Sequence, residues 1–175
     1  MVEVYDYRHL FGEKQRFRPA SRESWAEIEA ILGVQLPMDY KDFVDGYGDC
    51  IVAGHLYIPH PQGKERLVDW IADEVSSLES LVAIADDLPD VVREQYSRFI
   101  PWGYHDWDGD TCYFLPPLDD EGWSVVVAFR QCHDVLIRKG SFADFLESVC
   151  SGEGIPRSWP KGSPVWESVE GSPLI

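Results

Sequence analysis

The sequence predicts a single α+β domain in which an antiparallel-rich sheet packs against several helices. Apolar residues recur with the helical period of about 3.6 in several separate segments. Short β-branched and aromatic runs, separated by turns rich in Pro, Asp and Gly, follow the longest of these segments. The 175 residues suit one domain, and a hydrophobic fraction of 45% provides enough apolar area for a core.

Two helices are expected near the start of this domain. The first begins after Ser21 or Ser24, because either hydroxyl can accept the free N–H groups of a first turn, and it ends at Gly33. The second begins after Pro37, whose missing N–H suits a first helical position, and it carries apolar residues at i, i+3, i+4 and i+7. We expect the two helices to form a hairpin.

A strand and a long helix come next. Residues 51–58 are apolar and rich in β-formers, and Pro59 closes them, so they are predicted to form one strand. Residues 64–88 follow the helical period and form one long amphipathic helix, or two shorter ones in line, ended by Pro89. Residues 90–97 add a short turn of helix.

The remaining elements are three strands and a closing helix. The strands are expected over residues 111–115, 123–130 and 133–138. The middle one alternates large apolar residues with smaller ones, so one strongly apolar face should meet the helices. Ser141 begins a final helix that Gly152 can stop.

The predicted organisation is an N-terminal arm (1–20), the domain proper (21–150) and a C-terminal tail (151–175). The arm carries alternating apolar residues that suit either a short edge strand or a segment packed on the body. The tail is rich in Gly, Ser and Pro and contains Trp159 and Trp166, so it either lies on the body or stays mobile.

The net charge of the chain limits the kinds of molecule that it can bind. A formal net charge of −16 repels nucleic acid and anionic membranes and attracts a basic protein. The alternative explanation is that the acidity only keeps the domain soluble. The four cysteines form no C-x-x-C pair, and the sequence contains neither an apolar leader nor a run that could span a bilayer, so we expect reduced thiols and a cytoplasmic location. The oligomeric state is left open.

Four stretches in a fixed order carry a resemblance. They are Ile28-Glu29 with Leu32-Gly33-Val34, Leu36-Pro37, Asp39-Tyr40 and Phe43; Tyr47-Gly48; Phe99-Ile100-Pro101-Trp102-Gly103 with Gly109-Asp110; and Ser141-Phe142 with Asp144-Phe145-Leu146. Together they resemble the SUKH superfamily, which includes the Smi/Knr-type cell-wall regulators, over roughly residues 21–150. The chain departs from that pattern in lacking Asn at the Tyr47-Gly48 turn and in its long Trp-bearing tail.

The resemblance implies a SUKH-like, non-catalytic domain that binds proteins. Many bacterial relatives look like immunity proteins, which neutralise the toxins of contact-dependent or secreted polymorphic systems. Because many such toxins are nucleases with basic surfaces, an acidic inhibitor of this kind suits the charge of this chain. The alternative function is a Smi/Knr-type regulatory scaffold that binds several cellular proteins.

The loop over residues 105–110 concentrates three carboxylates and an imidazole. Such a loop either binds a metal ion, forms a turn with exposed acids, or faces a partner. It does not follow the EF-hand pattern, because Thr111 stands where Gly is required and Pro117 where Glu is required. No metal or other cofactor is therefore predicted.

A second acidic turn, at residues 119–121, would complete a partner-binding patch if both acidic loops lie on one side of the molecule. Trp102 is either an anchor of this patch or part of the core. The predicted contacts are Trp102, Asp106, Trp107, Asp108, Asp110, Asp119, Asp120 and Glu121.

No catalytic site is predicted. Cys132 and His133 are adjacent in the chain, and adjacent residues on a strand point to opposite faces, so the two cannot act as a nucleophile and base pair. The sequence contains no phosphate-binding Gly-rich loop, nucleophile elbow or zinc-protease motif.

Overall fold

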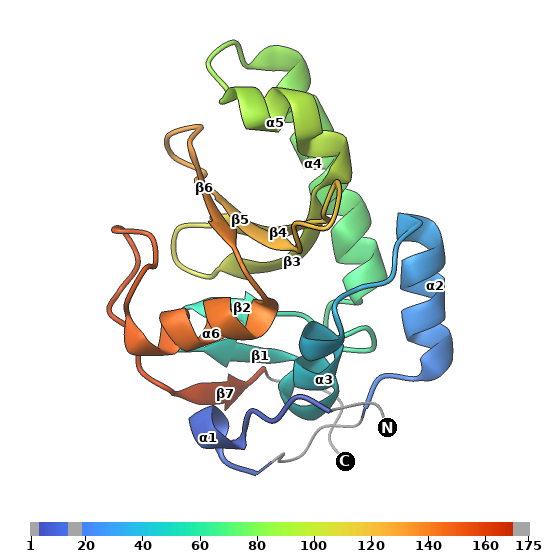
Figure 1. Ribbon diagram of the computed structural model, residues 1–175, viewed down its shortest axis with the longest axis vertical. Coiled ribbons are helices and arrows are strands. Elements are labelled where there is room, and N and C mark those ends of the chain that lie inside the picture. Colours follow the sequence, from blue (N-terminus) through green and yellow to red (C-terminus); the bar gives the residue numbers. More distant parts are fainter. Residues whose placement is uncertain (1–3, 14–18, 170–175) are drawn as a thin grey trace.

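A computed structural model describes residues 4–13 and 19–169 (Figure 1). Within these residues the strands form one seven-stranded sheet in the order β6-β5-β4-β3-β2-β1-β7, and each neighbouring pair is antiparallel. This confirms the α+β class with an antiparallel sheet. The strands are β1 (Cys50–Val52), β2 (Leu56–Ile58), β3 (Ile100–His105), β4 (Thr111–Leu115), β5 (Ser124–Ala128), β6 (Val135–Lys139) and β7 (Trp166–Ser168).

The helices begin and end at the residues that their local chemistry favours. Ser21 accepts a hydrogen bond from the backbone N–H of Ser24, and Ser141 forms a complete capping box with Asp144. Gly33 and Gly152 end their helices with φ of 69° and 76°, a left-handed conformation that a side chain would strain. The helices are α1 (Arg8–Phe11), α2 (Arg22–Leu32), α3 (Met38–Tyr47), α4 (Leu67–Ile84), α5 (Asp90–Gln95) and α6 (Phe142–Ser151), with a 3₁₀ turn at Tyr96–Arg98.

Helices cover both faces of the sheet. On β5, Val125 and Val127 belong to a large core that includes side chains of α2, α3 and α6. Val126, between them, points to the other face and packs in a second cluster with Leu78 of α4 and Val92 of α5. The expectation of a single buried face on this strand was therefore incomplete, because α4 and α5 shield the face that carries Val126 (Figure 1).

Residues 51–58 form a hairpin, not the single strand expected from their apolar character. The chain turns at Ala53 and Gly54, which have φ of 53° and 77°. All three residues of β2 are buried, so the alternation that would have revealed two strands is absent. The turn matters for the site because it places His55 directly before β2, and β2 pairs with β3.

Both segments that flank the predicted domain contribute to the core. Tyr7 is 2% exposed and contacts Phe43 edge to face, with ring centroids 5.2 Å apart. Trp159 is 4% exposed, and β7 pairs with β1. The possible N-terminal edge strand is not formed by residues 4–7, which lead into α1, and Val2 lies outside the described residues. Residues 170–175 of the tail also lie outside them.

Candidate functional site

The antiparallel order places alternate turns at the same end of the sheet. The β1–β2, β3–β4 and β5–β6 turns lie at one end, which we call the triple-turn end. The β4–β5 turn, with residues 119–121, lies at the opposite end, because Leu115 and Ser124 face each other there. The structure therefore does not unite the two acidic loops into the single patch that the sequence suggested.

The predicted contact residues differ in accessibility. Trp102 is 1% exposed and stacks on Phe114 with ring centroids 5.4 Å apart, so it belongs to the core and offers no surface to a partner. Asp110 is 3% exposed and is also withdrawn from the surface. Trp107 is 65% exposed, and the carboxylates of Asp106, Asp119, Asp120 and Glu121 are exposed as well, while Asp108 is half-buried.

At the triple-turn end, the β3–β4 turn folds its polar groups inward. Nδ1 of His105 accepts a hydrogen bond from the backbone N–H of Asp108 at 3.1 Å and lies 3.7 Å from that residue's Oδ2. Asp110 accepts hydrogen bonds from the backbone N–H of Arg130 at 3.1 Å and from Nε1 of Trp159 at 3.0 Å. One buried carboxylate thus connects the β3–β4 turn, the β5–β6 turn and the C-terminal segment.

A second imidazole, that of His55, packs against this turn. Its ring centroid lies 4.8 Å from that of His105 and 5.3 Å from that of Trp159. Both imidazoles are 0% exposed. Burial, together with the neighbouring His105, lowers the pKa of His55 to about 4, and burial also lowers the pKa of His105. Both rings are therefore neutral at pH 7.

A groove of about 520 Å³ separates the triple-turn end from α4. Its walls meet where the hydroxyl of Thr111 donates to Oε2 of Glu74 at 3.2 Å. Burial raises the pKa of Glu74. Nearby, His133 of the β5–β6 turn lies 2.8 Å from a carboxylate oxygen of Asp87, in the connection between α4 and α5. On its helical side the groove is therefore lined by one acid, Glu74, and on the opposite side by Arg130 and His133.

Glu74 and Asp87 belong to a strongly acidic segment of the chain, residues 67–95, which we call the α4–α5 segment. It contains eight acidic residues and a single Lys or Arg, a net charge of −7 out of −16. All the acids except Glu74 are exposed, and the one cation, Arg93, donates to the backbone carbonyls of Asp86 and Leu88. The predicted contacts omit this segment. The segment was overlooked because its acids are spread along two helices and form no compact motif. A count of net charge over a window as long as this segment would have found it.

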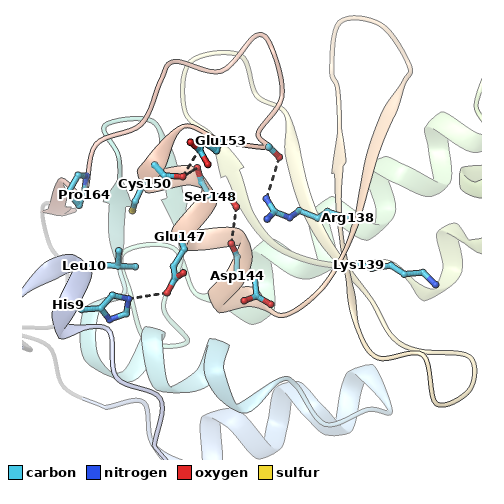
Figure 2. A pocket seen from close by; sticks show the side chains of 12 residues that line it. His9, Leu10, Arg138, Lys139, Asp144, Glu147, Ser148, Cys150, Glu153 and Pro164 are labelled. Atoms are coloured by element: carbon cyan, nitrogen blue, oxygen red, sulfur yellow. Dashed lines mark hydrogen bonds and ion pairs between the residues drawn. The ribbon is translucent and has the colours of Figure 1, made fainter.

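The pocket in Figure 2 lies between α1, α6, β6 and the C-terminal segment and encloses about 810 Å³. Its acids and bases compensate one another. Nε2 of His9 lies 3.0 Å from a carboxylate oxygen of Glu147, and Arg138 donates to the carbonyl of Gly154 at 3.4 Å. With no predominant charge, this pocket indicates no particular ligand. Its other lining residues are Leu10, Lys139, Asp144, Ser148, Cys150, Ser151, Glu153 and Pro164.

An apolar groove of about 480 Å³ lies on the other flank of α4. It is lined by α2, α4 and the residues that lead into β3, and Ile31 at its rim is 64% exposed. Nothing in its lining distinguishes one kind of apolar partner from another.

Comparison with known proteins gives one match. The family model SUKH_6, described as SMI1-KNR4 cell-wall, matches residues 22–146, from the start of α2 into α6. No curated protein and no solved structure matches the chain. Among the described residues, every helix is too short or too polar to cross a membrane.

Proposed function

The chain belongs to the SMI1-KNR4 cell-wall family, a branch of the SUKH superfamily, and we propose that it is an immunity-type inhibitor that binds one cognate bacterial toxin through an acidic face. The family includes immunity proteins that act by binding, and the proposal assigns no catalytic step to this chain. Inhibition follows if the bound chain covers the surface that the toxin uses on its own substrate.

The observation that carries the proposal is the acidity of the α4–α5 segment. Seven exposed acids, with a single, backbone-bonded cation among them, attract a basic protein and speed its association. Basic surfaces are typical of proteins that bind nucleic acid phosphates. A nuclease toxin is therefore the class of partner that this surface fits best, because the acids would occupy its phosphate-binding site.

The β3–β4 turn extends this face on the near side of the groove. Trp107 is exposed on that turn and is flanked by Asp106 and Asp108. An exposed Trp between two acids has the composition of a hot spot that anchors a complex while the charges steer it. One cation, Arg130 of the β5–β6 turn, lies against Gly109 of the β3–β4 turn. We place the binding face on the α4–α5 segment and this turn.

The experiment is a pull-down from the producing cells with the tagged full chain at ~50 mM and ~300 mM NaCl, followed by mass spectrometry. We expect one basic, near-stoichiometric protein whose retention decreases as salt rises. Its affinity is then measured with the triple variant Asp73→Asn, Asp86→Asn, Glu94→Gln, which should weaken binding at least tenfold by removing three exposed charges from the proposed face.

The matched control removes three exposed charges elsewhere, in Glu13→Gln, Glu153→Gln, Glu167→Gln, and should leave affinity within about twofold of wild type. A third triple variant, at residues 119–121, tests the acidic turn at the opposite end of the sheet. A loss confined to that variant would move the binding face away from the α4–α5 segment. Several substoichiometric partners would favour the scaffold function, and an acidic partner would contradict the proposal.

A further inference from the structure

The β3–β4 turn gathers metal-ligating groups of two chemical kinds. One imidazole nitrogen of His105 and one carboxylate oxygen each of Asp108 and Asp110 lie within 4.8 Å of one another. His105 and Asp110 are 0% and 3% exposed, and the side chain of Asp108 is 38% exposed. Two of the groups are therefore fixed by packing at the end of a strand, and the third faces solvent, from which an ion can enter.

A separate observation at His55 also indicates a ligand. This side chain is 0% exposed, and among the residues that the structure describes neither of its ring nitrogens has a hydrogen-bond partner. Nε2 of the buried His105 ring likewise has none among these residues. Buried polar atoms in native proteins are almost always satisfied, so exceptions gathered at one place point to a group that binds there.

The spacing of the two rings agrees with a shared ion. With Zn–N distances of about 2.0–2.1 Å and a tetrahedral angle, two imidazoles on one zinc ion have ring centroids about 5 Å apart. The centroids of His55 and His105 are 4.8 Å apart. The centroid spacing therefore permits a shared ion. His55 is not among the three groups whose ligand atoms lie within 4.8 Å of one another, so binding requires its ring to turn a nitrogen toward them.

The carboxylate of Asp110 is oriented as a ligand would be. Trp159 donates to one of its oxygens through Nε1, and the backbone N–H of Arg130 donates to the other. Hydrogen bonds of this kind hold a ligating carboxylate in position and raise metal affinity. Each oxygen keeps a further lone pair for an ion.

We propose that His55, His105, Asp108 and Asp110 bind one divalent transition-metal ion, and that zinc fits them best. Two imidazole nitrogens and two carboxylate oxygens suit zinc, whereas calcium and magnesium take sets made of oxygen. The departure from the EF-hand pattern concerns oxygen ligands alone and does not bear on this site. The ion joins the β1–β2 turn, the β3–β4 turn and, through Asp110, the C-terminal segment. This proposal is independent of the binding partner.

The test uses the full chain with Cys132→Ser. The exposed thiol of Cys132 lies at the same end of the sheet and could bind zinc separately from the proposed site. After treatment with a chelator, the protein is titrated with Zn²⁺ by calorimetry and with Co²⁺ by visible absorption, which reports tetrahedral coordination. Tryptophan fluorescence gives a second signal, because Trp159 stacks on His105 with centroids 5.1 Å apart. We expect one equivalent of metal.

Three variants test three of the four proposed ligands, and a fourth variant is the control. Asp108→Asn, His105→Gln and His55→Gln should each weaken metal affinity at least tenfold, whereas Asp106→Asn removes a neighbouring exposed acid and should leave it unchanged. Asp108 is the decisive position because its half-exposed side chain can be replaced without disturbing the core. Circular dichroism of the variant checks that the fold is unchanged. The proposal is overturned if wild type binds no equivalent of metal, or if Asp108→Asn and Asp106→Asn bind it equally well.

Discussion

Nε1 of Trp159 donates a 3.0 Å hydrogen bond to Oδ2 of Asp110, although 49 residues separate them in the chain. The donor lies beyond the residues that match the family model, and the acceptor lies within them. The C-terminal segment is thus attached to the triple-turn end by a buried, charge-assisted bond. Such bonds are stronger than those between neutral groups, so this contact contributes directly to the stability of the domain.

Replacing Trp159 with Phe should destabilise the protein by about 1.5–3 kcal/mol. The change keeps an aromatic ring against His105 but removes the donor to the buried carboxylate of Asp110. Urea unfolding followed by circular dichroism measures the effect. Trp107→Phe is the control, and because Trp107 is 65% exposed, its free energy of unfolding should stay within about 0.5 kcal/mol of wild type. Equal effects of the two changes would show that the hydrogen bond has no role.

The stability of the metal-free protein should decrease with acidity because of His55. Burial lowers its pKa in the folded state to about 4, whereas the unfolded chain takes up the proton near 6.5. The unfolded state therefore binds more protons between these values, so the stabilisation is complete above about pH 6.5 and is lost as the pH falls toward 4.

Urea unfolding in EDTA at pH 7 and pH 5 tests this dependence. Wild type should lose about 2 kcal/mol more over this interval than His55→Gln, which has no imidazole to protonate. Comparison with the variant removes the contribution of the carboxylates, which titrate in both proteins. The same pH dependence in both would mean that His55 is protonated in the folded state as readily as in the unfolded chain.

The N-terminal segment should prove indispensable for stability. Tyr7 is 2% exposed, packs on Phe43 and donates its hydroxyl to the carbonyl of Asp39 at 2.8 Å. Tyr7→Ala leaves a cavity and an unsatisfied carbonyl and should cost about 3–5 kcal/mol in urea unfolding. Val4→Ala, at a position 61% exposed, should cost less than about 0.5 kcal/mol. A small loss for Tyr7→Ala would show that the arm is dispensable.

The sequence was most informative where local chemistry decides the structure. Ser141 and the stop signals Gly33 and Gly152 predicted the start of α6 and the ends of α2 and α6 correctly, and of the two candidate caps of α2, Ser21 and Ser24, the structure has Ser21. The order of the family motifs predicted the fold, and the family model confirms it. These signals act within a few residues of the atoms they position, so they can be recognised before any tertiary contact is known.

The sequence was least informative where a contact depends on strand pairing. His55 and His105 meet because Leu56 pairs with His105 across β2 and β3, and no local pattern encodes that register. Likewise, the single acidic patch required both acidic loops to lie on one side, but consecutive turns of an antiparallel meander alternate between its ends. Trp102 illustrates a third limit, because its residue type suits a core and a hot spot equally well.

The position of β7 has a consequence for the synthesis of the chain. β1 to β6 lie in the sheet in chain order, so each can pair with its predecessor soon after it emerges from the ribosome. The outer edge of β1 must wait for Trp166–Ser168, more than one hundred residues later. Until then its backbone N–H and C=O groups are free to pair with another nascent chain. A protein that stops short of β7 therefore carries an open edge, and its hazard is aggregation during translation even if its core is otherwise complete.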